Sequence, residues 1–424
     1  MTSCTTSTRH CTKHSLLERP LVIKFGGTSV GGGAEFVRAA RIAAGAAPEN
    51  PVAVVVSAMS GTTDTLLGYA RKSSGWVKQT LEYETHEASI AELRRMLAER
   101  HLHAAREAVS AEYLPGVEGR IVDLLGELEE AIAAYYDNLK ARRDEIAVYG
   151  ERLSAEILAG AISSQGAPAA VVTADPIATD TRFGEAEVDP EATRERSARS
   201  VTPLLESGLV AVVPGYVGRS PRGATTTLGR GGSDLSATVL GRALGSGEVW
   251  IMSDVDGVLD ADPRLVPDAH LMPRLSYREA GIFAGLGAKV LHPRTMEPAS
   301  EAGIEVYVRN TFAPDGAGTH VTGFDPGAGV RCVALRQNVA MEIPCTDGRE
   351  GRAAMVVCIG SPEEEDLARG RRCLREAGIP VQHFGMAAAG LVFVVSADVG
   401  LEALRALHAG LIPPAGDLAG EEVA

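Results

Sequence analysis

The sequence predicts an α/β protein in which a large domain built on a parallel sheet precedes a smaller α+β module. Three observations support this fold class. Strand and helix patterns follow one another from residue 21 onward, and the composition changes near residue 313. The strand patterns are apolar runs without alternation, which is typical of strands buried on both faces. A chain of 424 residues is also long enough for two hydrophobic cores.

The large domain begins with a strand, a helix and a second strand. We expect the strands at 21–25 and 52–57 and the helix at 34–46. The rest of the domain is expected to contain a helix at 143–163, strands at 168–173, 209–214, 248–253 and 304–308, and a helix that ends near 244.

A helical insertion interrupts this pattern at about 78–142. The segment is charged, and Pro115-Gly116 predicts a break inside it. Its apolar residues recur at helical spacing, at Ile121, Leu124, Leu125, Leu128 and Ile132. We interpret the insertion as structural cover for the domain.

Composition also predicts where the domains end. Residues 313–330 are rich in Gly, Pro and Asp, which is typical of a linker. The expected divisions are a tail at 1–19, a catalytic domain at 20–312, the linker, a module at 331–410 and a second tail at 411–424. In the module we expect strands at 338–343, 353–359, 379–384 and 390–396, with helices at 363–377 and 400–409.

Charge and cysteine content exclude several function classes. The net charge of −14 argues against non-specific binding to nucleic acid or to anionic lipid. None of the six cysteines forms a CxxC pair, which favours reduced thiols in a cytoplasmic protein. Cys4, His10, Cys11 and His14 fit no common zinc spacing, so we expect no metal ligands. We find neither a secretory signal in 1–19 nor an apolar run long enough to span a membrane.

Two glycine-rich loops indicate phosphate binding. Lys24 ends the first strand and is followed by Gly26, Gly27, Thr28 and Ser29. Glycines let the backbone approach an oxyanion, and a helix that begins just after such a loop strengthens the attraction. A tight strand-to-helix turn is the alternative interpretation.

The second loop runs from Gly229 to Asp234, about 200 residues downstream. No segment fits the GxxxxGK[ST] pattern, and no GxGxxG follows the first strand. Asp254 and Asp256 follow a later strand, and Lys289 lies in a Gly-Ala-Lys-Val-Leu-His-Pro segment. Two such loops and two lysines are suited to phosphoryl transfer, where catalysis is mainly positioning and charge neutralisation.

At these residues the sequence resembles the aspartate kinases of the amino acid kinase superfamily. The resemblance covers about residues 20–325. The matching segments, in the family's order and spacing, are Lys24–Val30, Ser57–Thr63, Gly150–Ser154, Thr225–Asp234, Ser253–Arg264 and Gly287–Pro293.

This resemblance implies a three-layer α/β/α amino acid kinase fold with an ACT-like C-terminal module. It implies that ATP, with Mg²⁺, phosphorylates the β-carboxylate of L-aspartate to 4-phospho-L-aspartate, the first step toward lysine, threonine and methionine. It also implies a homodimer or a higher homo-oligomer. The chemistry agrees, because a carboxylate with a pKa of ~4 is already ionised at neutral pH and needs no general base.

The resemblance assigns a role to each site residue. Lys24 would hold the γ-phosphate, and Asp234 would orient Lys24. The substrate would be bound by Ser57, Thr63, Glu151, Tyr216, Arg230 and Ser233, with Glu151 on the ammonium and Arg230 on a carboxylate. The nucleotide would be bound by Gly26, Gly27, Thr28, Ser29, Gly231, Gly232, Ser253, Asp254, Asp256, Leu259, Arg264 and Lys289.

Structural roles compete with some of these assignments. Glu151 and Arg152 also suit a solvated helix face, and Asp254, Asp256 and Arg264 also suit surface turns. Leu259 stands where the family usually has an aromatic residue, and Asp64 stands where it has Asn. Both changes put nucleotide or substrate affinity in question.

The C-terminal part departs further from the family pattern. Only 95 residues follow residue 329, which is room for one ACT-like module or a remnant instead of two. We therefore expect weak or absent feedback inhibition by lysine or threonine. Two other functions remain open: a kinase of a related acidic amino acid in specialised metabolism, and a non-catalytic regulatory homologue.

Overall fold

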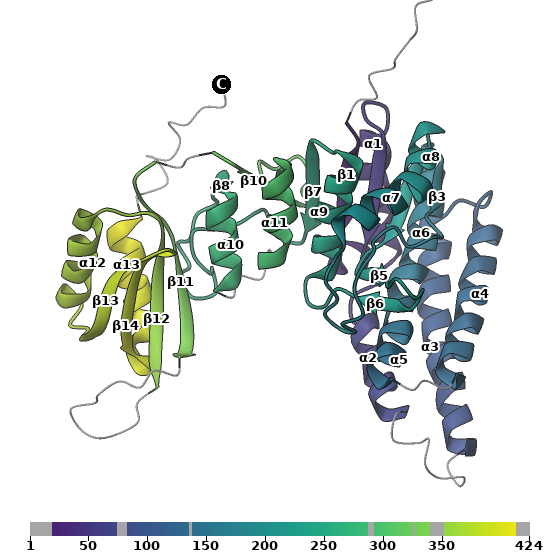
Figure 1. The fold of residues 1–424 in the computed structure, drawn as a ribbon, viewed down its shortest axis with the longest axis horizontal. Helices are drawn as coiled ribbons and strands as arrows, with labels where there is room; N and C mark the ends of the chain where they lie inside the picture. The colour runs from purple at the N-terminus through teal and green to yellow at the C-terminus, as the bar shows by residue number, and fades with distance from the viewer. Residues whose placement is uncertain are drawn as a thin grey trace, which may run out of the picture.

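The computed structural model describes residues 19–73, 83–134, 138–286, 292–324, 327–339 and 352–412. These residues form an elongated molecule with a large domain at one end and a C-terminal module at the other (Figure 1). An eight-stranded sheet organises the large domain, in the order β3-β4-β2-β1-β7-β9-β10-β8. Its strands are β1 (Leu21–Phe25), β2 (Val52–Val56), β3 (Ala169–Val171), β4 (Val210–Pro214), β7 (Glu248–Ser253), β8 (Arg274–Ser276), β9 (Glu305–Asn310) and β10 (Thr319–Thr322).

The first six strands of this order run parallel, from β3 to β9. Strand β1 lies between β2 and β7, so Lys24 is level with Val55 on one side and Ile251 on the other. The carboxyl ends of all six strands therefore meet at one edge. Chain order reverses on the two sides of β1, and ligands of open α/β sheets bind outside the strand ends at such a switch point.

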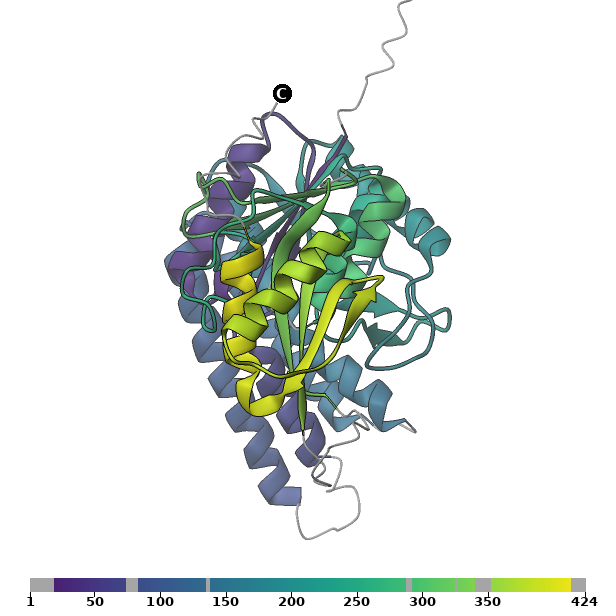
Figure 2. The same ribbon diagram turned by 90° about the vertical axis from the view of Figure 1, so that its left-hand side faces the viewer.

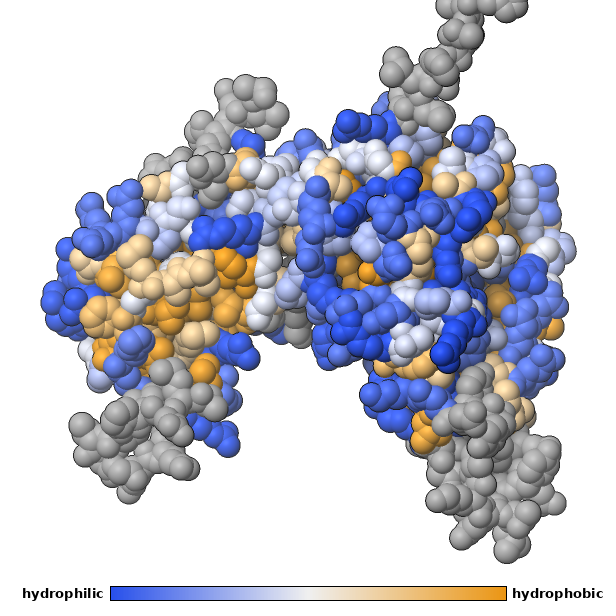
Figure 3. All heavy atoms as spheres, in the orientation of Figure 1, coloured by the Kyte–Doolittle hydropathy of each residue, from blue (hydrophilic) through white to orange (hydrophobic). Residues whose placement is uncertain are grey.

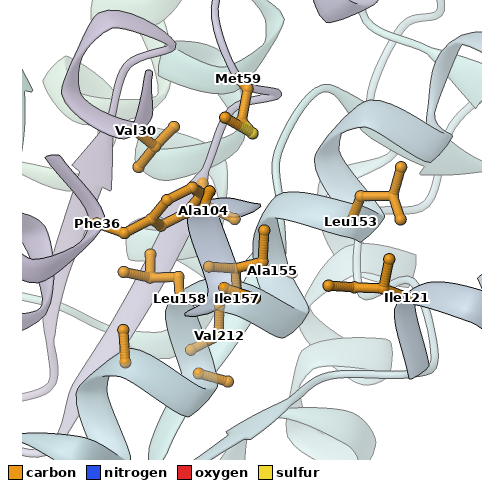
Figure 4. Packing of buried hydrophobic residues seen from close by; sticks show 14 of the residues in the cluster. Val30, Phe36, Met59, Ala104, Ile121, Leu153, Ala155, Ile157, Leu158 and Val212 are labelled. Atoms are coloured by element: carbon orange, nitrogen blue, oxygen red, sulfur yellow. The ribbon is translucent and has the colours of Figure 1, made fainter. Parts of the chain in front are cut away.

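Helices cover both faces of the sheet. Ile23 of β1 belongs to one core, with residues of α1 (Gly33–Ala46) and α6 (Tyr149–Ser164), while Val22 belongs to the other, with residues of α9 (Gly232–Leu244) and α11 (Pro293–Ala302). Figure 4 shows the first core, where Phe36, Val30 and Leu158 point toward one another. The expected three-layer α/β/α fold is confirmed.

The remaining elements of the large domain are short or peripheral. They are the 3₁₀ turn η1 (Thr28–Val30), α2 (Thr62–Ser73), α7 (Pro190–Ser200), α8 (Thr202–Glu206), α10 (Tyr277–Gly285), and a hairpin of β5 (Val217–Arg219) and β6 (Thr225–Thr227).

The expected insertion is helical where it is described. Helices α3 (Tyr83–Ala108) and α4 (Leu114–Ala133) lie side by side and extend away from the sheet (Figure 1). The apolar residues at helical spacing on α4 are all buried. The expected break in the insertion lies just before Pro115, because α3 ends at Ala108, α4 begins at Leu114, and Pro115 occupies the first turn of α4, where its missing N–H costs nothing.

The helix expected at 143–163 is two helices. Helix α5 (Leu139–Ala147) ends just before α6 begins at Tyr149. Val148 between them keeps helical backbone angles, with φ −72° and ψ −12°. Neither proline nor glycine marks the boundary, so the sequence carries no signal for it.

The linker expected at 313–330 contains regular structure at two places. Strand β10 lies inside it and joins the main sheet beside β9 and β8, and β11 begins at Gly329 instead of 338. Four residues between Gly318 and Gly323 are too few to show strand periodicity above a Gly-rich background.

The C-terminal module is a four-stranded antiparallel sheet with two helices. Its elements are β11 (Gly329–Val339), β12 (Ala353–Ser361), α12 (Glu364–Glu376), β13 (Val381–Ala387), β14 (Gly390–Ser396), the 3₁₀ turn η3 (Ala397–Val399) and α13 (Gly400–Leu411), with strand order β11-β12-β14-β13. Figure 2 shows α12 and α13 on the sheet face that points away from the large domain. This arrangement fits the expected ACT-like module.

The other face of the small sheet packs against the large domain. Cys332, Val357 and Ile359 share a core with Leu275 and Phe283. Beside this core, the guanidinium of Arg331 lies 3.3 Å from a carboxylate oxygen of Glu279, and both side chains are nearly buried.

Candidate active site

A cavity of about 340 Å³ opens at the carboxyl ends of the parallel strands. It is lined by Lys24, Gly27, Ser57, Ala58, Met59, Ser60, Gly61, Thr63, Asp64, Glu151, Tyr216, Gly229, Gly231, Gly232, Ser233 and Asp234. Segments that are as far apart in the chain as Lys24 and Asp234 therefore meet at the switch point of the sheet. Two glycine-rich loops, one lysine and one buried glutamate share a single cavity.

Lys24 and Asp234 form an ion pair in this cavity. Lys24 Nζ lies 2.5 Å from Asp234 Oδ1, and the two side chains are only 11% and 15% exposed. Strand β1 supplies the lysine and the first turn of α9 supplies the aspartate. Gly26 leaves room for the ammonium, because a Cβ there would lie 3.3 Å from Nζ. The lysine is thus held in place with its charge at the cavity wall.

The N-terminus of α9 also faces the cavity. Gly231 precedes the helix with a left-handed φ of 70°, and no side chain caps the first turn. The unpaired N–H groups of a helix start attract phosphate. A Cβ on Gly231 would lie 2.4 Å from Cβ of His292, so glycine is required by both conformation and space.

Glu151 is a buried carboxyl in the wall of the cavity. Burial raises its pKa to about 8, although hydrogen bonds from Ala58 and Thr63 lower the pKa in part. Its Oε2 atom is buried without a hydrogen-bond partner. A buried carboxylate is costly unless a cation pairs with it. The site is therefore suited to a ligand that brings an ammonium group.

Tyr216 stands next to this carboxyl. It takes a left-handed φ of 69°, which is uncommon for a residue with a side chain. Burial raises the pKa of its phenol to about 12, and the negative charges of Glu151 and Asp144 add to the rise. The phenol is therefore protonated near neutral pH and available as a hydrogen-bond donor.

Several residues expected in the site do not line this cavity. Ser29 is buried behind its loop, where its hydroxyl lies 2.7 Å from that of Thr311, so it serves the fold. Arg264 is exposed and bonds to its neighbour Asp262 in a surface turn. Asp256 accepts a hydrogen bond of 2.7 Å from Asn310, beyond the end of β7.

The other nucleotide and substrate candidates lie around the cavity. Gly26 is partly buried and Thr28 is exposed on the first loop, while Arg230 is exposed on the second. Ser253 donates a 3.2 Å hydrogen bond to Asp254 at the end of β7. Leu259 pairs with Leu271 in an isolated bridge. Lys289 lies outside the described residues.

Sequence reasoning assigned no role to some residues at the cavity. Met59, Ser60 and Gly61 line it, and they belong to a segment whose motif could have identified them. His292 packs on Gly231, and burial lowers the pKa of its imidazole. The contact between His292 and Gly231 joins two loops that are far apart in the chain, so no local sequence pattern could have indicated it.

Comparison with known proteins places this site in a family. A model described as the amino acid kinase family matches residues 19–310. The chain belongs to the amino acid kinase family. Curated relatives narrow the assignment to the aspartokinases: lysine-sensitive aspartokinase 3 of Escherichia coli is 33% identical over 75% of this chain and 68% of its own length.

Plant relatives are longer than this amino acid kinase. Aspartokinase 3, chloroplastic, of Arabidopsis thaliana is 34% identical over 76% of this chain, but the match covers 56% of the relative. The chain thus spans a little over half the length of the Arabidopsis aspartokinases it matches.

Solved structures of the E. coli enzyme agree in fold. Aspartokinase III in complex with lysine and aspartate has a TM-score of 0.75 at 26% identity, covering 93% of this chain and 100% of that one. The complex with aspartate and ADP has a TM-score of 0.73 at 26% identity, covering 92% of this chain and 99% of that one.

None of the helices in the described part of this chain has the length and apolar character needed to cross a bilayer.

Proposed function

We propose that this chain is an active aspartate kinase, which transfers the γ-phosphoryl group of MgATP to the β-carboxylate of L-aspartate. The observation that carries the proposal is the cavity itself. It combines a lysine–aspartate pair, an uncapped helix N-terminus and a buried carboxyl with an unpaired oxygen. Phosphate and an amino acid are the ligands that this combination suits. The solved aspartokinase with aspartate and ADP supports the same pair of ligands.

The main task of such a site is to bring two anions together. Lys24 would neutralise charge on the transferring phosphoryl group, and the start of α9 would contribute its N–H groups. Asp234 lies 2.5 Å from Lys24 Nζ and would orient it. It need not remove a proton, because the acceptor carboxylate is already ionised. Mg²⁺ would enter as part of MgATP, held largely by phosphate oxygens and water.

Substrate recognition would use the opposite wall. Glu151 would pair with the ammonium of aspartate, and Tyr216 would donate a hydrogen bond. Ser57, Thr63 and Ser233 line the same cavity and would contact the substrate. Arg230, exposed at its rim, would bind a carboxylate through a fork of donors. Nucleotide contacts would come from the first loop, from Ser253 to Arg264, and from Lys289.

ADP release with three substrates tests this assignment. Aspartate should support turnover, because it brings both the ammonium and the reactive carboxylate. Succinate keeps the two carboxylates but has no ammonium, so it should be a poor substrate. Glutamate tests the alternative acceptor, a related acidic amino acid. Equal rates with succinate and aspartate would contradict the proposed pairing of Glu151 with the substrate ammonium. No turnover with any of the three would favour a non-catalytic homologue.

We also propose that the chain forms a homodimer through the C-terminal module. Strand β13 is an edge strand of the small sheet. Phe384 and Met386 on it are 36% and 54% exposed, and Figure 3 shows hydrophobic residues gathered over this module. Exposed edges and apolar patches favour association.

Weak feedback inhibition by lysine and threonine is also part of the proposal. It stays a prediction until each amino acid is titrated into the kinase assay.

A further inference from the structure

Three side chains that bind metals well meet at the junction of the two domains. Asp260 and His270 belong to the segment between β7 and β8, and His408 belongs to α13 of the C-terminal module. A hydrogen bond also joins the domains here, because the side chain of Arg405 on α13 donates through Nε to the backbone carbonyl of Leu265 at 2.8 Å. None of the three lines the active-site cavity.

The spacing of their atoms fits one small cation. His408 Nε2 lies 3.0 Å from Asp260 Oδ1, and His270 Nδ1 lies 3.4 Å from Asp260 Oδ2. The three ligand atoms all lie within 4.8 Å of one another. Ligands that surround zinc tetrahedrally at about 2.0–2.1 Å stand roughly 3.3 Å apart. The two histidine-to-carboxylate separations are close to that value, although each imidazole faces a different oxygen of Asp260. The side chains would have to shift slightly to surround one ion.

Burial makes the arrangement informative. Asp260 is 1% exposed and His408 is 7% exposed, while the side chain of His270 is 38% exposed and lies at the edge of the cluster. Asp260 Oδ2 and His270 Nδ1 are both buried without a hydrogen-bond partner, although they lie 3.4 Å apart. Asp260 Oδ1 is held by the backbone N–H of His270 at 3.0 Å, which fixes the carboxylate. Two polar atoms that face each other in a buried position need a proton or a metal ion between them, and a metal ion would use the lone pairs of both.

We propose that Asp260, His270 and His408 form a zinc site that joins the large domain to the C-terminal module. Two imidazoles and one carboxylate are a common zinc ligand set, and they leave a fourth position for water. Because one ligand comes from α13, the ion would hold the module against the loop after β7. The ligands are 10 and 138 residues apart along the chain, so no sequence spacing could have indicated the site.

Zinc titration of the metal-free full chain tests the proposal. Cys4 and Cys11 offer thiolates outside the described residues, so the protein should carry Cys4→Ser and Cys11→Ser. We expect one Zn²⁺ per chain, a rise in Tm on binding, and the visible absorption of four-coordinate Co²⁺ when cobalt replaces zinc. His408→Gln or His270→Gln should weaken zinc binding at least about 100-fold, because each removes one of three protein ligands.

His320→Gln is the matched control. His320 also pairs with a carboxylate, 2.9 Å from Glu305, and its side chain is 26% exposed. This variant should keep the parent's zinc affinity. The proposal is overturned if the parent binds no zinc stoichiometrically, or if His270→Gln and His408→Gln both bind zinc as the parent does. Circular dichroism identifies a misfolded variant. The cobalt spectrum of the parent tests four-coordinate metal binding by itself, so the proposal can be tested even if a ligand variant misfolds.

Discussion

Lys24 is the residue whose charge the proposed reaction depends on most. Lys24→Ala should lower kcat about 10²–10³-fold, because a preorganised charge that acts on the transition state contributes that much. The KM for aspartate should change little, since Lys24 would act on the phosphoryl group. Steady-state kinetics give both values. Lys140→Ala, on the exposed surface of α5, is the control. Equal losses in kcat and in aspartate affinity would indicate a structural loop.

Glu151 should give the reaction a characteristic pH dependence. The ammonium of aspartate needs an ionised partner, and the pKa of Glu151 in the free protein is about 8. The kcat/KM for aspartate should therefore rise with pH up to about 8 and then level off. Glu151→Gln should lower kcat/KM and abolish this rise with pH. If kcat/KM of the variant still rises with pH up to about 8, the rise is caused by the ionisation of another group.

The same carboxyl should make stability depend on pH. Its pKa in the folded protein is about 8, above the ordinary 4.5, so the folded state holds the proton more tightly. Its contribution to stability is full below about pH 4.5 and is lost as pH rises toward 8. Glu151→Gln should then be more stable than the parent at pH 8, on the order of a few kcal/mol. Thermal unfolding across this range measures the effect, with exposed Glu130→Gln as the control.

At the scale of elements, the two ends of α9 offer a matched pair of glycines. Gly231 and Gly245 both have left-handed backbones, with φ of 70° and 69°. A Cβ would lie 2.4 Å from His292 at Gly231 and would meet nothing within 4 Å at Gly245. Alanine at Gly245 should cost about 1 kcal/mol of stability because of its left-handed backbone alone, and alanine at Gly231 should cost more because the clash with His292 adds to this. Only Gly231→Ala should also lower kcat/KM for ATP, by tenfold or more, because its loop faces the cavity. Equal activity in both variants would contradict a phosphate-binding role for this loop.

The sequence predicted elements well where burial leaves a strong pattern. Strands β1 and β2 are buried on both faces, so their apolar runs were plain. Strands β8 and β10 have three and four residues, too few to show a period. The boundary between α5 and α6 at Val148 has helical angles and no breaking residue, so only packing decides it.

At the scale of the whole molecule, the active-site cavity was largely predictable and the domain junction was not. Lys24, Glu151 and Asp234 lie in motifs whose residue types indicate their chemistry, and all three meet in one cavity. Asp260 and His408 meet only because the C-terminal module docks on the large domain. No local pattern encodes that docking.

Association is the prediction that belongs to this scale. Light scattering should give a mass near twice the 44.3 kDa of one chain. Met386→Lys should weaken the dimer about tenfold or more, because it places a charge on the exposed edge strand. Leu139→Lys, at a 58% exposed residue of the large domain, should leave the mass unchanged. A parent that is monomeric at all concentrations would contradict the proposed interface.

Trapping the product with hydroxylamine shows whether the acceptor is the β-carboxylate of aspartate, because an acyl phosphate reacts to give a hydroxamate. The full chain is incubated with aspartate, MgATP and hydroxylamine, with glutamate in a parallel reaction. We expect β-aspartyl hydroxamate in an amount equal to the ADP released, and almost no hydroxamate from glutamate. ADP release without hydroxamate, or hydroxamate mainly from glutamate, would contradict phosphorylation of the aspartate β-carboxylate.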